Sequence, residues 1–310
     1  MRRCLLATMA ATMTIASPTA AQMPNLAEVG AQYLPPVRAR PDEPLDAQIT
    51  SYDVALNVPL PLGETTFLIP GASYHVDSVS YAGGSPEFID LRGFHGVDLP
   101  ILFVQLLPQD WSLSLRFSAG LAGDFQAVDG SMVRINAMGM ASHTFSESFS
   151  LGGGALASYA FGSLLPLPVV FVDYRPHPRW SVTAFVPAFV QSTVTVGDRL
   201  ELGYRVDVQG NAYAIRDERI AERWPCVSSA EGAAAEPHAC LDHVAYSLVS
   251  AGPTVNVRLF ATVWLETFVG HSVYRRFDLM NAEDEPVPGG REELPRSWLV
   301  RGGLTWRIAM

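Results

Sequence analysis

The side chains best suited to bind a metal lie together in residues 226–243. Cys226, His238, Cys240, Asp242 and His243 all fall in this stretch. Thiolate and imidazole groups are the ligands that zinc prefers, so one interpretation is a zinc site. The alternative is a disulfide, which two nearby cysteines form most simply in an oxidising compartment. We expect a Cys226–Cys240 disulfide, with no metal and no cofactor.

Acidic side chains are concentrated in residues 278–295. One interpretation is a divalent-cation site built from carboxylates. The other is a solvated outward loop, or one that bridges lipopolysaccharide through cations. We expect the solvated loop, because no spacing here matches a calcium-binding loop. The charged residues are Asp278, Glu283, Asp284, Glu285, Arg291, Glu292 and Glu293.

Two histidines, His75 and His271, fall within predicted strands. A membrane-embedded hydrolase would need a serine, a histidine and an orienting polar group on adjacent strands. Neither histidine has such a neighbour in the sequence, and no Gly-x-Ser-x-Gly motif is present. We therefore expect no catalytic residues, and a hydrolase is the third functional alternative.

The largest set of polar side chains alternates with apolar residues along the chain. Its arginines and carboxylates are nearly balanced in number, whereas a strongly selective pore would carry one sign of charge at its constriction. A set of balanced arginines and carboxylates favours ion pairs between strands, which narrow or occlude the lumen. We predict that the lumen is lined by Asp53, His75, Asp77, Arg116, Arg134, Asp173, Arg175, Glu201, Arg205, Asp207, Arg258, Glu266, Arg301 and Arg307.

Strict alternation identifies the elements that carry these charges. In residues 111–121 every odd position is apolar and every even position is polar or glycine, and residues 200–208 and 298–308 follow similar patterns. A period of two indicates a strand with one apolar face. A soluble sandwich also alternates. Strands of about ten residues or more, with charges at mid-strand, instead favour an antiparallel transmembrane β-barrel.

Connections of alternating length support this fold class, since outer-membrane barrels have short periplasmic turns and long extracellular loops. The pattern predicts fourteen strands. If 26–35 is a periplasmic tail and 180–196 is one strand, about twelve remain. The predicted strands are 26–35, 48–60, 65–81, 97–107, 112–122, 131–142, 148–161, 167–175, 180–187, 188–196, 200–215, 243–257, 262–277 and 296–309.

Aromatic residues near the strand ends predict the two girdles that such a barrel places at the membrane interfaces. The periplasmic girdle is predicted to contain Trp111, Trp180 and Trp306, with Phe67 and Phe149. The opposite girdle is predicted to contain Tyr33, Tyr81, Phe125, Tyr159, Tyr213 and Tyr274.

The N-terminal residues 1–21 have the features of a secretory signal peptide. Two arginines precede a short apolar stretch, and Thr19-Ala20-Ala21 provides a small-residue cleavage site. We expect the barrel to span residues 22–310. The formal net charge of −10 gives no basic surface for nucleic acid. No apolar stretch reaches the roughly 18 residues of a membrane helix.

Several short motifs add a resemblance. They resemble the motifs of a family of uncharacterised bacterial outer-membrane barrels, described only as a domain of unknown function. The motifs are Tyr33-Leu34-Pro35, Tyr174-Arg175-Pro176, Trp180 followed by Pro187, and the strand at Gly71–Tyr74. The resemblance covers nearly the whole mature chain and implies the same barrel, with no catalytic residues to transfer.

The C-terminus is similar to the signal read by the barrel-assembly machinery, because apolar residues alternate back from the end. Met310 stands in place of the usual terminal aromatic residue, and Ile308, Trp306 and Leu304 precede it. We expect a location in the bacterial outer membrane. The expected partners are its lipid and lipopolysaccharide, together with the assembly machinery and periplasmic chaperones.

The sequence therefore leads to three functional hypotheses. The first is a passive channel or transport barrel for small solutes, with weak selectivity from the balanced lumen charges. The second is a structural or surface-interaction barrel with an occluded lumen. The third is the membrane-embedded hydrolase.

Overall fold

The computed structural model describes residues 25–38, 46–82, 93–160, 163–218, 241–282 and 284–307. The predicted signal peptide, the predicted Cys226–Cys240 disulfide and the last three residues lie outside these ranges.

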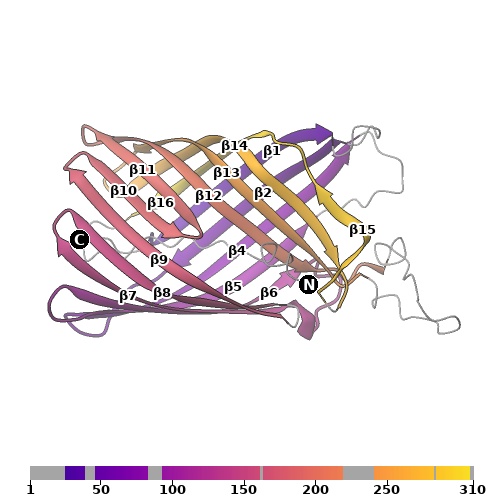
Figure 1. The fold of residues 1–310 in the computed structure, drawn as a ribbon, viewed down its shortest axis with the longest axis horizontal. Coiled ribbons are helices and arrows are strands. Elements are labelled where there is room, and N and C mark those ends of the chain that lie inside the picture. The colour runs from indigo at the N-terminus through magenta and orange to yellow at the C-terminus, as the bar shows by residue number, and fades with distance from the viewer. Residues whose placement is uncertain are drawn as a thin grey trace, which may run out of the picture.

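Fourteen antiparallel strands form the wall of a closed β-barrel (Figure 1). In chain order they are β1 (Ala27–Arg38), β2 (Asp46–Asn57), β4 (Thr66–Ala82), β5 (Phe94–Leu106), β6 (Trp111–Gly123), β7 (Val133–Ser146), β8 (Phe149–Ala160), β9 (Ser163–His177), β10 (Trp180–Val186), β11 (Phe189–Val196), β12 (Leu200–Ala214), β13 (His243–Arg258), β14 (Val263–Met280) and β16 (Trp298–Trp306).

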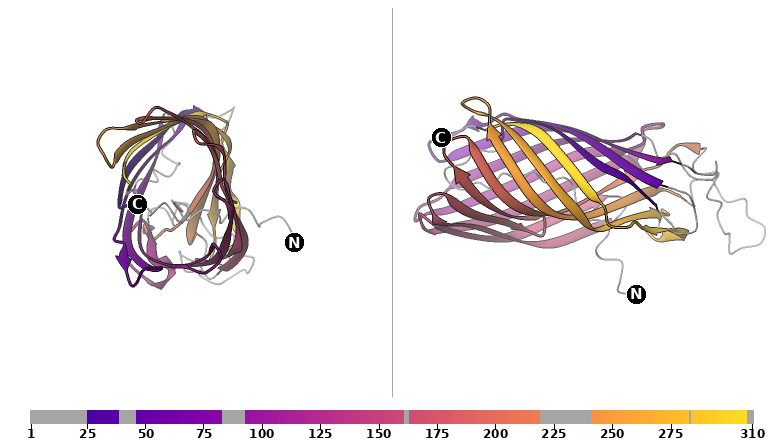
Figure 2. Two further views of the ribbon diagram at one scale, coloured as in Figure 1. Left: turned by 90° about the vertical axis from the view of Figure 1, so that its left-hand side faces the viewer. Right: turned by 90° about the horizontal axis from the view of Figure 1, so that it is seen from above.

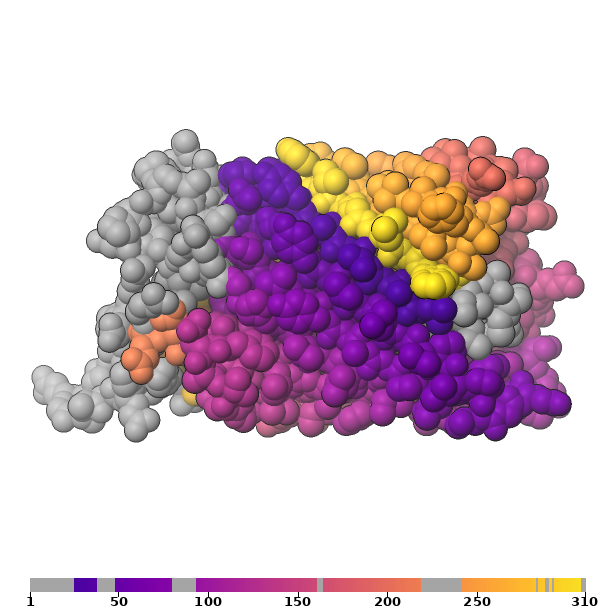
Figure 3. Space-filling view, turned by 180° about the vertical axis from the view of Figure 1, so that it is seen from behind, coloured from indigo at the N-terminus to yellow at the C-terminus, as the bar shows by residue number. Residues whose placement is uncertain are grey.

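The first and last strands close the barrel. Residues of β1 from Ala27 to Tyr33 pair antiparallel with β16 from Trp306 back to Val300. Figure 3 shows this seam, where β16 in yellow lies against β1 in indigo. The end-on view in Figure 2 shows the strands arranged in a ring. Closure leaves no sheet edge at the seam, so the backbone groups there are paired.

The fourteen-strand prediction is confirmed, and the twelve-strand alternative is wrong. β1 is a full member of the wall, since β2 and β16 pair with it on either side. Residues 180–196 are two strands, because the chain reverses at Pro187-Ala188 and Phe185 pairs with Phe189.

Two short elements extend neighbouring strands. β3 (Leu60–Pro61) pairs with β4, and β15 (Pro286–Glu293) pairs with the far end of β14. The prediction of a solvated loop over residues 278–295 is therefore wrong in part. Asp278 belongs to β14 and is buried, where Arg276 and Arg291 bind it as ion pairs. Hairpin pairing satisfies backbone groups that a loop would leave to water.

The outer face of the barrel is apolar. Along β6, Leu115 and Phe117 are 45% and 48% exposed, whereas the alternating Ser114 and Ser118 are buried. The same alternation recurs around the wall because successive side chains of a strand point to opposite faces. The exterior is thus suited to lipid and the interior to polar groups. No helix within the described ranges is long and apolar enough to span a membrane.

The interior is packed at the end of the barrel that carries the long loops, on the right of Figure 1. We call this the loop end and the opposite end the turn end. Buried apolar side chains from β1, β2, β4, β5, β6, β12, β13, β14 and β16 form one cluster there. The last residue of β12, Ala214, pairs in parallel with Gly123 of β6. Among the described residues, side chains therefore fill this end.

The hairpin β10–β11 is much shorter than its neighbours. Its strands have 7 and 8 residues, whereas β9 and β12 each have 15. β10 begins at the turn end and β11 ends there, so the tip at Pro187-Ala188 stops partway up the wall (Figure 1).

Candidate functional site: a charged chamber inside the barrel

Two adjoining cavities occupy the interior between the packed loop end and the turn end. The central cavity has a volume of about 180 Å³, and the cavity nearer the turn end has about 590 Å³. We refer to the two together as the chamber. Six residues line both cavities: Glu28, Asp53, Phe189, Arg205, Glu266 and Arg301.

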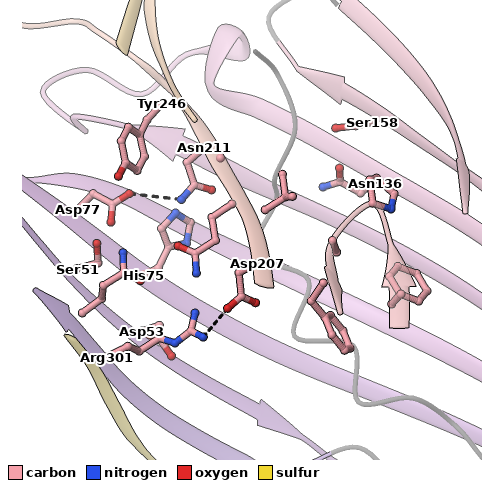
Figure 4. Close-up of a pocket in the computed structure, with 18 of the residues that line it drawn as sticks. Ser51, Asp53, His75, Asp77, Asn136, Ser158, Asp207, Asn211, Tyr246 and Arg301 are labelled. Carbon is pink, nitrogen blue, oxygen red and sulfur yellow. Dashed lines mark hydrogen bonds and ion pairs between the residues drawn. The ribbon is translucent and has the colours of Figure 1, made fainter. Parts of the chain in front are cut away.

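A three-residue ion pair lies where the two cavities meet. Arg205 Nε is 2.6 Å from Asp207 Oδ1, and Arg301 Nη2 is 2.8 Å from Asp207 Oδ2. Asp207 and Arg301 come from β12 and β16, which are separated by β13 and β14 in the wall, so their contact reaches across the interior. Figure 4 shows Arg301 pointing to Asp207. The carboxylate is almost fully buried and is compensated by two guanidinium groups.

A second ion-pair group lines the turn-end cavity. Arg307 Nη2 is 2.6 Å from Glu266 Oε1, and Arg307 Nη1 is 3.2 Å from Glu201 Oε2. Thr305 and Asn256 donate further hydrogen bonds to these carboxylates, at 2.7 and 3.0 Å. The group joins β12, β13, β14 and β16 around this part of the chamber.

A hydrogen-bonded group crosses the barrel at the loop-end side of the central cavity. The Tyr213 hydroxyl donates to Asp77 and lies 2.9 Å from His75 Nε2. Asn211 Nδ2 donates to the same Asp77 carboxylate at 3.3 Å, as Figure 4 shows. These contacts join β4 to β12, and they place Tyr213 inside the barrel. Its predicted place in an aromatic girdle is therefore wrong.

Asp53 differs from the other chamber carboxylates. Among the described residues it has no ion-pair or hydrogen-bond partner, although it lines both cavities. The side chain lies over Gly30, where an added Cβ would be 2.5 Å from Asp53 Oδ1. Glycine at position 30 therefore makes room for a carboxylate that faces the chamber.

An apolar cluster lies on the side of the chamber formed by β7–β11. Met138, Met140, Val169, Phe171, Phe185 and Phe189 form a buried cluster there, with Leu156 and Ala188 packed against it. The alternation of residues along the chain did not reveal this cluster. Residues 164–172 are apolar at every position, so alternation could not separate the inward face of β9 from its lipid-facing side.

The structure brings most of the predicted lumen residues together in the chamber. Arg116 and Arg134 line neither cavity. Arg134 is buried and forms an ion pair with Asp98 of β5. Arg116 lies on the inward face of β6, between its strand partners Leu102 and Met138. The chamber is lined by Asp53, His75, Asp77, Asp173, Arg175, Glu201, Arg205, Asp207, Arg258, Glu266, Arg301 and Arg307.

The other residues that the sequence singled out take different places. Trp111, Trp180 and Trp306 are exposed on the outer face at the turn end. His271 points outward and is exposed, whereas His75 points inward. The two histidines therefore do not share a site.

A cluster around Arg216 holds the loop-end rim together. Arg216 Nε is 2.6 Å from Asp129 Oδ2, and Arg216 Nη2 is 2.9 Å from Asp242 Oδ1. Asp124 accepts hydrogen bonds from the backbone N–H groups of Arg216 and Asp217, at 2.7 and 2.8 Å. The cluster, which we call the rim clasp, joins the segment after β6 to both ends of the β12–β13 connection.

The Asp242 carboxyl of the rim clasp is held in its ionised form. Burial alone would raise its pKa, but the hydrogen bond with His243 and the charge of Arg216 keep the pKa below the ordinary value of 3.8.

Histidine and carboxylate side chains at this rim are already engaged with one another. His243 lies 3.1 Å from Asp242 and 3.2 Å from Asp284. Across the described ranges, no group of three or more His, Cys, Asp or Glu side chains is placed to hold a metal ion. Cys226, His238 and Cys240, the remaining members of the zinc interpretation, lie outside those ranges.

Comparison with solved structures finds several barrels. The COG4313 outer membrane channel from Pseudomonas putida F1 is 10% identical with a TM-score of 0.45, over 95% of this chain and 100% of that one. The Pseudomonas putida toluene transporter TodX is 8% identical with a TM-score of 0.37, over 91% and 88%. LpxR from Salmonella typhimurium is 9% identical with a TM-score of 0.35, over 90% and 99%.

No curated protein matches this sequence. Residues 87–231 match the family model described as Domain of unknown function (DUF6268). This match bears out the resemblance to a family described only as a domain of unknown function, and the described part of the chain forms a closed fourteen-stranded antiparallel β-barrel.

Proposed function

We propose that this chain is an outer-membrane transport barrel that lets small solutes pass without consuming energy. The observation that carries the proposal is the chamber, a pair of adjoining cavities lined by charged side chains inside a wall whose exterior is apolar. A barrel that served only as a membrane anchor would have no need to keep so many charged groups in its interior, because each costs desolvation free energy.

The chamber charges suit a weakly selective passage. Arg205 and Arg301 neutralise Asp207, and Arg307 neutralises Glu266 and Glu201. Rings of a single charge give strong selectivity, and the described lining of this chamber contains none. We therefore expect small conductance with little preference between cations and anions.

The packed loop end limits this passage. Apolar side chains and the His75–Tyr213–Asp77 contacts occupy that part of the interior among the described residues. The same packing favours the second candidate, a structural or surface-interaction barrel with an occluded lumen. Outer-membrane lipid, lipopolysaccharide, the assembly machinery and periplasmic chaperones remain the proposed partners in either case.

Planar-bilayer recording of the purified, folded protein tests the first candidate. Arg205→Ala opens space in the chamber and leaves Asp207 with one arginine, so we expect a changed conductance or a shift toward cation preference. Arg116→Ala is the matched control, because Arg116 also points inward but lines neither cavity. Folded protein that never conducts would favour the structural barrel. Equal effects of the two substitutions would contradict the assignment of the chamber as the passage.

A further inference from the structure

We propose that the barrel wall has a lateral window above the β10–β11 hairpin, through which small, largely apolar molecules with one polar end move between the chamber and the membrane. This inference rests on the proposed transport function and adds the route and the class of solute.

The strand pairing defines the window. β9 pairs with β10 only from His177 to Val170, although it continues to Ser163 at the loop end. β12 pairs with β11 only from Leu200 to Asp207, although it continues to Ala214. Among the described residues, no strand pairs with this edge of β9 above the hairpin tip. The β12 edge is paired there at a single residue, Ala214, with Gly123 of β6. Figure 1 shows the short hairpin lying between the two longer strands.

The far end of β12 lies away from β9. Ala214 accepts a hydrogen bond from the backbone N–H of Asp124, beyond the end of β6, at 3.0 Å. Tyr213 reaches across to His75 of β4. Because β12 turns toward β6 and β4, it does not close the space beside the upper half of β9.

The upper edge of β9, beyond its pairing with β10, contains residues that cannot donate backbone hydrogen bonds. The N–H of Arg175 donates to Ser148 on the β8 side, at 2.7 Å. Strand alternation then directs the backbone N positions of residues 166 and 168 toward the window, and both are prolines. Proline has no N–H to donate, and it is confined to edge strands in sheets. Pro166 and Pro168 therefore prevent a further strand from completing the wall here.

The central cavity lies directly behind the window. The β9 edge contributes Leu165, Leu167 and Val169, and the hairpin tip contributes Pro187 and Ala188. The β12 edge contributes residues 208–211. Every edge that bounds the window therefore also lines the cavity.

The outer face beside the window is apolar and exposed. Leu164 on β9 is 66% exposed, and Val186 at the hairpin tip is 46% exposed. A molecule leaving the window on this side would meet a surface suited to lipid, so it must itself be soluble in an apolar phase.

The walls of the central cavity define the solute. Apolar side chains of β8–β11 lie on one side, including Leu156, Phe185 and Phe189. Asp53 and Asp77 lie on the other side. Asn136 of β7 and Ser158 of β8 lie away from these two carboxylates, as Figure 4 shows. An apolar body can pack on the first side while a polar end donates a hydrogen bond to the unpaired Asp53 carboxylate. A small aromatic amine has this chemistry.

The test uses intact cells that make the full chain, with the fluorescent amine N-phenylnaphthylamine as the probe. Leu167→Trp places a bulky side chain at the inner edge of the window. Val170→Trp is the matched control, because it adds the same group three residues away on the lipid-facing side of β9. Each variant is also checked for a heat-dependent shift in SDS mobility and for ion conductance.

We expect wild-type cells and Val170→Trp cells to take up the probe several-fold faster than cells without the protein. Leu167→Trp cells should take it up at the rate of cells without the protein. Unchanged uptake in Leu167→Trp, or wild-type uptake no faster than in cells without the protein, would overturn the window. Absence of ion conductance in all folded variants would contradict the proposed function. The uptake rates would still show whether the window exists.

Discussion

Asp207 shows how single residues hold the chamber in shape. Its carboxylate is almost fully buried and binds Arg205 and Arg301, which lie on strands far apart in sequence. Removing one partner of a buried ion pair leaves an uncompensated charge, which costs more than the pair contributes. The ion pair therefore acts mainly as a constraint on sequence: a carboxylate at position 207 requires arginine partners at positions 205 and 301.

Asp207→Asn should destabilise the folded barrel by about 3 kcal/mol, because two buried guanidinium groups lose their counter-charge. The free energy of unfolding in urea, measured in lipid vesicles, checks this. Asp53→Asn is the control, since Asp53 has no ion pair among the described residues. A loss of stability in Asp53→Asn as large as in Asp207→Asn would contradict the argument.

Asp242 gives the rim clasp a defined dependence on pH. Its folded-state pKa lies below the ordinary value of 3.8, so its stabilising effect is fully present above pH 3.8 and is lost as the pH falls through the folded pKa. The melting temperature of wild type should exceed that of Asp242→Asn at neutral pH, and the difference should shrink below pH 3.8. Asp110→Asn, at an exposed turn of the opposite end, should show no such difference. A gap between wild type and Asp242→Asn that is constant down to the most acidic pH would contradict the role of the clasp.

At the scale of the elements, β7 and β8 approach each other closely at a run of glycines. A Cβ added to Gly154 would collide with the backbone carbonyl oxygen of Gly139. Gly153 points the other way, and the nearest atom to its added Cβ is the Val169 carbonyl oxygen at 3.9 Å. Glycine at 154 is therefore required by the backbone of the neighbouring strand, which cannot move aside as a flexible side chain could.

Gly154→Ala should strongly reduce the fraction of protein that folds, because the pairing of β7 with β8 must distort to admit the methyl group. Gly153→Ala should fold like the wild type. The fraction of protein with heat-dependent mobility in SDS measures both variants. Equal folding of the two would show that the barrel wall adapts at this position.

The strands were largely predictable from the sequence, but the window in the wall and the inward course of β12 were not. Period-two alternation placed the strands because it depends only on neighbouring residues, and the break at Pro187 was visible as a proline. The window could not be predicted in this way, because it depends on how far each hairpin reaches along the barrel axis. Tyr213 was misplaced because the sequence gives no sign that β12 turns into the interior.

The chamber was predictable in part. Most of the predicted lumen residues line it, since alternation assigns a side chain to the inner face. Their partners were not predictable, because Asp207 and Arg301 are 94 residues apart and meet only through the stagger of the closed barrel. The apolar cluster was not predicted because residues 164–172 of β9 are apolar on both faces.

At the scale of the whole molecule, the barrel combines a closed wall, a packed loop end, a charged chamber and a short hairpin. The apolar exterior requires lipid around the wall, and the buried charges require the interior to stay shielded from it. These requirements are met together only if the chain folds in a membrane. The proposed chamber and window both require this chain to be a closed barrel in the outer membrane.

Electrophoresis in SDS of protein from outer-membrane fractions, with unboiled and boiled samples side by side, decides whether the chain is such a barrel. A closed barrel keeps its strand pairing in SDS until it is heated, so the unboiled protein should migrate differently from the boiled protein. A single band at one position in both lanes, with the protein recovered from the soluble periplasm, would contradict the account.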